Sequence, residues 1–284
     1  MACFYALMCR HALGIEAFWC TPHQIIYDGY PGPRSVVLIS ESGRTVDALA
    51  AFRACLRRPS SVPSIITADA KSDLAHLARG AGVEISLMPK GQRAPGFFPL
   101  TNTLLGCGTL VAATCDSKGV KGITEMFSSV YQDAMFVVNS VDSHVWSKKY
   151  FLVLHGPTGA PAAVDFRTRM FEAGIGAVYE EDIRNFCHGQ YRWLARNIRD
   201  VAVVLFGSAS DSRPYKHFLA TLPDDVSIID LRLESDDGTT ALVQLASSMW
   251  MLSKVALSRH VSLDDPDVPA WGQELYRGGG AFLW

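Results

Sequence analysis

The sequence shows no surplus of charge of either sign and no long uninterrupted apolar run. Its 284 residues include 26 basic and 28 acidic side chains, which gives a net charge of −2 at pH 7. A nucleic-acid surface is normally basic, so this balance argues against nucleic acid as a partner. Charged or glycine residues interrupt the apolar stretches before about 18 residues, the length that a membrane helix needs, so no membrane span is expected. Small-molecule chemistry is therefore favoured.

Paired cysteines are missing as well. The seven cysteines are odd in number and none forms a Cys-x-x-Cys pair, which argues against a disulfide framework or a zinc knuckle and fits a reducing cytoplasm. The histidines show no metal-ligand spacing, so neither a metal nor another cofactor is expected. The apolar segment 1–19 carries Arg10, His11 and Glu16 and lacks the pattern of a signal peptide, and we interpret it as a buried helix.

What the sequence does contain is a regular alternation of short apolar runs and helical patterns, with 49% hydrophobic residues. The predicted strands are 35–40, 62–67, 83–88, 150–154, 175–179, 200–206 and 226–231. The predicted helices are 45–57, 71–79, 96–114 (after an entering loop), 123–138, 160–173, 182–196, 213–222 and 239–258. Such alternation predicts an α/β protein whose parallel sheets are flanked by helices.

The pattern restarts after a polar, aperiodic stretch at 140–149, which we interpret as a linker. We therefore predict two α/β subdomains, 1–143 and 146–284. The first of them begins on a helix, without the strand that should precede it. The tail from Val261 is rich in proline and glycine.

A hydroxyl-rich loop joins the first predicted strand to its helix, with the sequence Ser40-Glu41-Ser42-Gly43-Arg44-Thr45. In an open parallel sheet, ligands bind beyond the carboxyl ends of the strands, and the N-terminus of a helix favours an anion. Three hydroxyl groups add hydrogen-bond donors, and the glycine permits close approach of the backbone. The loop therefore suits a phosphate group. The simpler interpretation is that Ser42 or Thr45 only caps the helix.

The loop resembles the Ser-x-Ser-Gly-x-Thr signature of the SIS (sugar isomerase) family of phosphosugar isomerases and phosphosugar-binding domains. The whole chain is similar to a tandem of two SIS units, as in the isomerase half of glucosamine-6-phosphate synthase. The resemblance implies two flavodoxin-like three-layer sandwiches, the first without its first strand. It also implies that Ser40, Ser42 and Thr45 bind a sugar phosphate, with Glu41 and Gly43 in the same loop.

The segment Thr101-Asn102-Thr103 falls where the family has a second hydroxyl-bearing helix start that lines the sugar. A plain helix cap is the alternative interpretation of these residues. Loop 207–212 also follows a strand and is rich in hydroxyl groups, but Asp211 would repel a phosphate, so an ordinary turn is expected there.

Aldose–ketose isomerisation through an enediol needs a base and a second group that serves the sugar oxygens. Glu172 and His188, sixteen residues apart, match in spacing the catalytic Glu and the ring-opening His of synthase-like enzymes. By resemblance Glu172 is the base, and His188 reaches the site of a neighbouring subunit, which implies a homodimer with the site at its interface. Taken alone, these residues are equally typical of a solvated helix end and a core histidine. Second candidates for the base are Glu180 and Glu181.

Arg169 lies one helical turn before Glu172 and shares its face. It would bind a substrate anion, lower the pKa of the carboxyl group, or form a surface ion pair. The last lysine is Lys254, so an imine formed by a tail lysine, as in the family, is not expected. Three functions stay open: a phosphosugar isomerase, an amino-sugar-phosphate deaminase or deglycase, and a non-catalytic phosphosugar sensor. The identity of the sugar is not specified.

Overall fold

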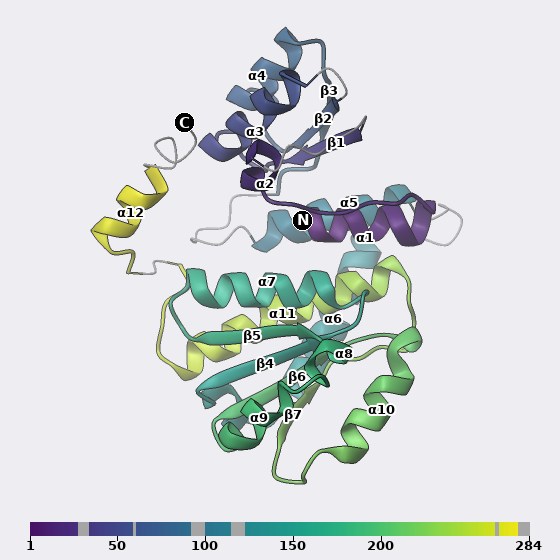
Figure 1. Cartoon of the computed structure of the whole chain (residues 1–284), viewed down its shortest axis with the longest axis vertical. Helices are drawn as coiled ribbons and strands as arrows, with labels where there is room; N and C mark the ends of the chain where they lie inside the picture. The colour runs from purple at the N-terminus through teal and green to yellow at the C-terminus, as the bar shows by residue number, and fades with distance from the viewer. Residues whose placement is uncertain (28–33, 59–60, 92–99, 115–122, 265–266, 278–284) are drawn as a thin grey trace.

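The computed structural model describes residues 1–27, 34–58, 61–91, 100–114, 123–264 and 267–277. It contains two sheets, one of three and one of four strands, with layers of helices between and around them (Figure 1). All strand pairs are parallel. The predicted α/β architecture with two helix-flanked parallel sheets is confirmed.

The first sheet has the strand order β1-β2-β3 within the described residues. Its strands are β1 (Arg34–Ile39), β2 (Ser61–Thr67) and β3 (Glu84–Leu87). Three helices, α2 (Pro22–Tyr27), α3 (Val46–Leu56) and α4 (Asp73–Gly80), cover one face. The core on this face is built by Phe52, Ile65 and Leu74, which are fully buried. In the described chain β1 pairs with β2 alone, so it forms one edge of this sheet.

The second sheet has the strand order β5-β4-β6-β7. Its strands are β4 (Tyr150–His155), β5 (Ala177–Asp182), β6 (Val201–Phe206) and β7 (Ser227–Asp230). On one face lie α6 (Ile123–Asn139), α7 (Ala160–Glu172) and α11 (Gly238–Ser258). On the other lie α8 (Ile183–Phe186), α9 (Tyr191–Asn197) and α10 (Ser212–Thr221) (Figure 1). Because both faces are covered, every residue of β6 is buried, as its continuous apolar run predicts.

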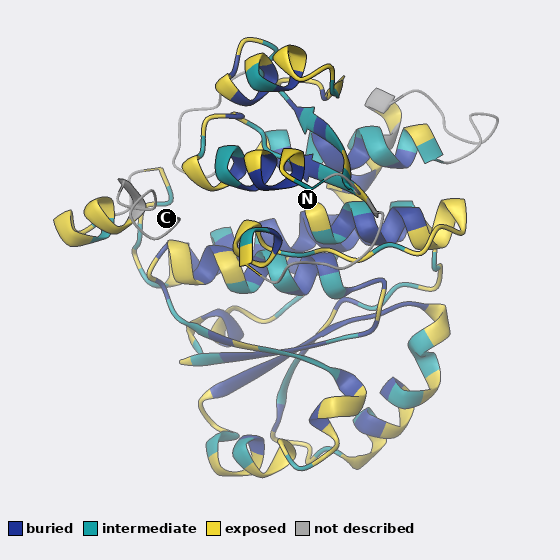
Figure 2. Ribbon diagram, turned by 45° about the horizontal axis from the view of Figure 1, so that its top comes forward, coloured by how far each residue is buried: buried dark blue, intermediate teal, exposed yellow. Residues whose placement is uncertain are grey.

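A helical layer joins the two sheets. Helices α1 (Ala2–Leu13) and α5 (Leu100–Thr114) pack against α7 and α11. Their shared core contains Phe4, Leu7, Cys107, Val111 and Leu242, and Figure 2 shows that the helices facing this junction are buried along it. None of the described helices combines the length and the apolar character of a membrane span.

Three predicted elements differ in the structure. The linker at 140–149 is packed rather than free: it forms the short 3-10 helix η1 (Ser143–Ser147), and Trp146 is only 4% exposed. The helix predicted at 182–196 is divided into α8 and α9. The residue that divides them is Gly189, whose φ of 117° is not accessible to a helix or to most side chains. The predicted buried helix of segment 1–19 ends at Leu13, and Phe18 is 74% exposed.

Strand β5 begins at Ala177 and ends at Asp182, three residues beyond the predicted end. This shift places two glutamates on the strand itself instead of after it. The tail contains a further helix, α12 (Ala270–Arg277), which extends from the body of the protein on the same side as the last turn of α7 (Figures 1 and 2). The predicted loop into α5 lies partly in residues 92–99, outside the described residues.

Candidate functional site

The loop between β1 and α3 is held in shape by the neighbouring strand and helix. The carbonyl oxygen of Glu41 accepts hydrogen bonds from the backbone N–H of Ala68 (3.1 Å) and from the hydroxyl of Thr67 (3.1 Å). The carbonyl oxygen of Gly43 accepts the N–H of Leu74 (3.0 Å). The loop is therefore tied to the end of β2 and to the start of α4.

Gly43 is required at its position for two reasons. Its φ is +59°, in the left-handed region that costs most side chains about 1–2 kcal/mol. A Cβ atom there would also lie 2.6 Å from the Cβ of the buried Ser72. Only glycine therefore allows the backbone of the loop to pass this close to the start of α4. A glycine at this position is also part of the predicted phosphate loop.

The hydroxyl groups of the loop do not cap α3. Thr45 is the N-cap residue, but its side chain makes no capping hydrogen bond. The Ser42 hydroxyl accepts the N–H of Arg44 (3.3 Å), and the Ser40 hydroxyl accepts that of Gly43 (3.2 Å). By contrast, the N-cap side chains of α4, α8 and α11 each accept a backbone N–H of their own helix. Within the described residues, the N-terminus of α3 therefore has no side-chain cap, as a helix start that receives an anion would require.

The start of α5 is joined to this loop by Asn102. Its amide Nδ2 donates to Glu41 Oε1 (2.6 Å), and its Oδ1 accepts the N–H of Gly91 (2.9 Å). Asn102 therefore turns the Glu41 carboxylate towards α5. Thr101 is exposed on the same turn.

Thr103 faces the second half of the chain instead. Its hydroxyl accepts a hydrogen bond from Arg169 Nη2 (3.3 Å) of α7. Arg169 is only 6% exposed, and its Nε donates to both oxygens of Asp165 (2.8 and 2.9 Å). Arg169 thus forms a buried ion pair within α7, and its hydrogen bond to Thr103 joins α7 to α5. The role of Arg169 as a ligand of the substrate stays a prediction.

Glu172 ends α7 one turn beyond Arg169 and lies at the exposed surface. Partial burial of the carboxyl group raises its pKa, Arg169 acts in the opposite direction, and Asp165 adds to the increase. A raised pKa is the direction that suits a general base working near neutral pH. The contacts of Asn102 and Thr103 place the loop after β1, the start of α5 and the end of α7 on one side of the molecule.

His188 does not lie near Glu172 within one chain. Glu172 precedes β5, whereas His188 follows it in the turn after α8. A strand of six residues spans about 20 Å, so the two side chains belong to opposite ends of β5. His188 is exposed. A site that uses both residues would need a second copy of the chain.

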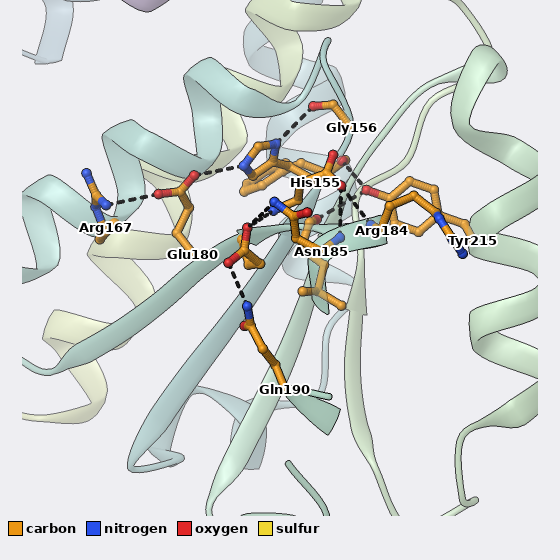
Figure 3. Close-up of polar contacts among 12 residues, drawn as sticks. His155, Gly156, Arg167, Glu180, Arg184, Asn185, Gln190 and Tyr215 are labelled. Atoms are coloured by element: carbon orange, nitrogen blue, oxygen red, sulfur yellow. Dashed lines mark hydrogen bonds and ion pairs between the residues drawn. The ribbon is translucent and has the colours of Figure 1, made fainter. Parts of the chain in front are cut away.

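A cluster that sequence reasoning missed lies at the carboxyl ends of β4 and β5 (Figure 3). His155 Nε2 lies 2.7 Å from Glu180 Oε1, and the other oxygen of Glu180 lies 3.0 Å from Arg167 Nη1. His155 Nδ1 lies 3.1 Å from the carbonyl oxygen of Gly156. Because both ring nitrogens face acceptor oxygens, the arrangement favours the doubly protonated ring. The sequence signal for this cluster is a histidine at the end of one strand and two glutamates near the end of the next. It was not recognised because the predicted strand ended at residue 179, before the glutamates.

The electrostatics of this cluster agree with its geometry. Burial by itself would lower the pKa of His155, but the hydrogen bond and charge of Glu180, the Gly156 carbonyl and Asp182 together raise it. The hydrogen bond from His155 lowers the pKa of Glu180. Glu180 is thus paired on both oxygens at the far end of β5 from Glu172, which makes it a poor alternative base for a site near the loop after β1.

Loop 207–212, after β6, is filled by carboxylates of the chain itself. Asp236 accepts hydrogen bonds from the N–H (3.1 Å) and the hydroxyl (2.9 Å) of Ser210. Asp211 accepts one from the buried hydroxyl of Ser208 (3.3 Å) and packs against Gly156. Burial raises the pKa of Asp211. These contacts support the interpretation of this loop as an ordinary turn.

The described residues contain no group of three or more histidine, cysteine, aspartate or glutamate side chains arranged to hold a metal ion. Two cavities of the described chain lie away from the loop after β1. One, of about 470 Å³, borders the exposed face of α6, and another, of about 530 Å³, lies beside the start of β7.

Comparison with solved structures identifies the fold. Tagatose-6-phosphate ketose/aldose isomerase from Escherichia coli superposes with a TM-score of 0.73 at 17% identity, over 94% of this chain and 82% of that one. Glucosamine-6-phosphate deaminase from Thermotoga maritima gives 0.71 at 14% identity, over 93% and 83%. The C-terminal domain of glucosamine-fructose-6-phosphate aminotransferase from Francisella tularensis gives 0.68 at 14%, over 93% and 82%.

This chain has the SIS fold. In sequence, neither the models of known families nor the curated proteins give a match. At such low identity the structural likeness establishes the SIS fold alone. It leaves the reaction and the roles of individual side chains to be argued from the site.

Proposed function

We propose that this protein binds a sugar phosphate at the loop after β1 and interconverts its aldose and ketose forms through an enediol. The observation that carries the proposal is the loop itself. Gly43 keeps its backbone close to α4, and the hydroxyls of Ser42 and Thr45 leave the first turn of α3 uncapped. An N-terminus with unpaired N–H groups and adjacent hydroxyls suits a phosphate dianion.

The proposed base is Glu172. It ends the helix whose Arg169 contacts Thr103, while the adjacent Asn102 holds Glu41 of the phosphate loop. A sugar whose phosphate lies on the loop would extend past the start of α5 towards the end of α7. The raised pKa of Glu172 supports its use as a base. Thr101 is exposed beside this path and is proposed as a further sugar ligand.

The proposed ring-opening residue is His188, supplied by a second copy of the chain. Within one chain β5 separates it from Glu172, so the pair requires a homodimer with the site at the interface. This arrangement agrees with the exposure of both residues. The proposed reaction uses no cofactor. We also propose that the protein is cytoplasmic, because its cysteine pattern fits a reducing compartment.

The decisive experiment follows solvent deuterium into carbons 1 and 2 of candidate sugar phosphates. Wild type should exchange one of these protons, and Glu172→Gln should lose about 10²–10⁴-fold in rate while it binds the sugar almost normally. Glu84→Gln, which changes an exposed carboxylate at the amino end of the first sheet, is the matched control and should keep the wild-type rate. Exchange by Glu172→Gln at the wild-type rate would place the base elsewhere.

The subunit arrangement has its own test. Glu172→Gln and His188→Ala should each be inactive, but in a mixed dimer one of the two sites is intact. Co-expression should therefore restore about a quarter of wild-type activity, since half of the random dimers are mixed. No restoration, or a monomeric mass by light scattering across micromolar concentrations, would contradict a shared site.

A deaminase is the second candidate, because it would use the same loop and base and because one structural neighbour is glucosamine-6-phosphate deaminase. Release of ammonia from an amino-sugar phosphate would distinguish it from an isomerase. Binding without proton exchange or ammonia release would favour a phosphosugar sensor. A thermal-shift screen against sugar phosphates, in which a ligand of the folded state raises the melting temperature, selects the compounds for both assays.

A further inference from the structure

Two adjacent glutamates lie just before the end of β5, and their side chains point to opposite faces of the second sheet, as successive strand positions do. Glu180 faces α7, where it pairs with Arg167 and with His155. Glu181 faces the side of α8 and α9, in line with Tyr179, whose ring lies 4.4 Å from that of Trp193 on α9. The two carboxylates therefore act on different parts of the structure.

Glu181 spans the turn that carries His188. Its Oε2 accepts a hydrogen bond from Gln190 Nε2 (2.8 Å). Its Oε1 accepts one from Asn185 Nδ2 (3.3 Å) and one from the N–H of Asp182 (3.0 Å). Asn185 and Gln190 lie on either side of His188, so one carboxylate holds both sides of the turn (Figure 3).

The turn has little packing to hold it in place. Phe186 before it and Leu194 after it are buried, but Cys187 and His188 are exposed. Gly189 adopts a φ of 117°, and a Cβ atom added there would meet nothing within 4 Å. The turn is also held by backbone hydrogen bonds. The N–H of His188 donates to the carbonyl oxygen of Asn185 (2.9 Å), and the carbonyl oxygens of Gly189 and Gln190 accept the N–H groups of Arg192 (3.2 Å) and Trp193 (3.0 Å). Hydrogen bonds rather than apolar contacts therefore determine the position of this turn.

We propose that Glu181 is the positioning residue for His188, holding its turn in the conformation that presents the imidazole to the partner subunit; this role rests on the function proposed above. The hydrogen bond from Gln190 lowers the pKa of the Glu181 carboxyl group, so the anion that makes these bonds persists at neutral pH. Charged groups near the Glu181 carboxylate include His155 of β4 and the neighbours of Glu181 on β5, Glu180 and Asp182.

Hydrogen exchange of the His188 amide tests this role without a substrate. Glu181→Met keeps the length of the side chain and removes its acceptors, and Gln190→Met breaks the same bridge without altering β5. Each should speed exchange of the His188 amide about tenfold, since a hydrogen bond to a charged group is lost. Arg167→Met breaks the Glu180 contact on the opposite face and should leave this amide unchanged. Unchanged exchange in both Met variants would overturn the proposal.

Gln190→Glu supplies a readout that a general loss of stability would not give. At pH 8 two carboxylates would face each other and repel, which should open the turn. Towards pH 5 one shared proton should restore the bridge and with it the wild-type protection factor of the His188 amide. Protection that stays low at both pH values, or high at both, would contradict the bridge.

Turnover separates this role from the proposed function. If wild type exchanges the sugar proton, Glu181→Met should lower kcat about tenfold with little change in KM, because ground-state binding of the phosphate is untouched. An unaltered kcat alongside faster amide exchange would overturn the positioning role. If wild type binds sugar phosphates but never exchanges the proton, the isomerase assignment fails, and the amide data still decide whether Glu181 holds the turn.

Discussion

The loops after β1 and after β6 have similar sequences but different hydrogen-bond partners. Both are short, contain glycine and several hydroxyl groups, and lead from a parallel strand into a helix. After β6, the carboxylates of Asp211 and Asp236 take the hydroxyl and N–H donors of Ser208 and Ser210. After β1, Glu41 is drawn away to Asn102.

In the first loop, Arg44 is likewise turned aside, since its Nη2 pairs with Asp69 Oδ2 at 2.9 Å. The charged side chains of this loop thus have partners outside it, and within the described residues no carboxylate caps the start of α3. If the loop after β1 binds a phosphate as proposed, hydroxyl content alone does not make an anion site. The difference between the two loops would then be whether the protein's own carboxylates reach the donors first.

The largest expected effect concerns the buried ion pair within α7, beside the hydrogen bond that joins α7 to α5. Arg169→Met removes one partner of a buried ion pair and leaves Asp165 uncompensated, which should cost about 3–5 kcal/mol of unfolding free energy. The double variant Arg169→Met/Asp165→Leu should recover much of this loss. Urea denaturation of the three proteins measures it. A single variant as stable as wild type would show that the stability of the fold does not depend on this pair.

The comparison of the two loops is tested directly by calorimetry with a sugar phosphate that the thermal-shift screen selects. Ser42→Ala and Thr45→Val should each weaken binding by about tenfold or more, because a hydrogen bond to a dianion contributes about 1.5–3 kcal/mol. Ser210→Ala, the matched change in the second loop, should leave affinity unchanged. Wild type should bind one ligand per chain. Two ligands per chain, or equal losses of affinity from variants of both loops, would contradict the proposed difference between the loops.

A smaller effect should appear at the carboxyl ends of β4 and β5. The pKa of His155 is raised on folding, so its contribution to stability is complete below about pH 6.5 and is lost as the pH rises through the folded value. Wild type should exceed His155→Gln by about 1–2 kcal/mol at pH 6, the value of a charge-assisted hydrogen bond in a half-buried setting. The difference in unfolding free energy should shrink towards pH 9. A difference that grows with pH would contradict the protonated ring.

The smallest effect is expected from Asp236→Ala. The hydroxyls of Ser208 and Ser210 lower the pKa of Asp236, so its contribution is present above about pH 4 and disappears as the pH falls through the folded value. Because the contact is near the surface, the loss should be below about 1 kcal/mol. Asp211 remains in this variant, so calorimetry with inorganic phosphate should still show no binding at the second loop. Phosphate binding at the second loop of this variant would show that Asp236 alone prevents anion binding there.

Most elements could be predicted from local pattern. Strand β6 and helix α11 are long, apolar runs of the expected period, and their bounds agree with prediction within two residues. The phosphate loop was predictable for the same reason, since its residues are contiguous. The ends of β5 and the division of α8 from α9 were not, because a strand end depends on pairing with β4 and because Gly189 interrupts a continuous helical pattern.

The α/β class, the resemblance to the SIS family and the loop Ser40–Thr45 can be predicted from the amino-acid sequence, because each depends on residues close together in the chain. The folded arrangement is needed to see that Arg169 is a buried link to α5 and that Glu172 and His188 lie at opposite ends of β5. It also gives Glu180 and Glu181, identical neighbours in sequence, different partners. Hydrogen-bond partners are set by which strand ends and helix ends the topology brings together, and no local pattern records that.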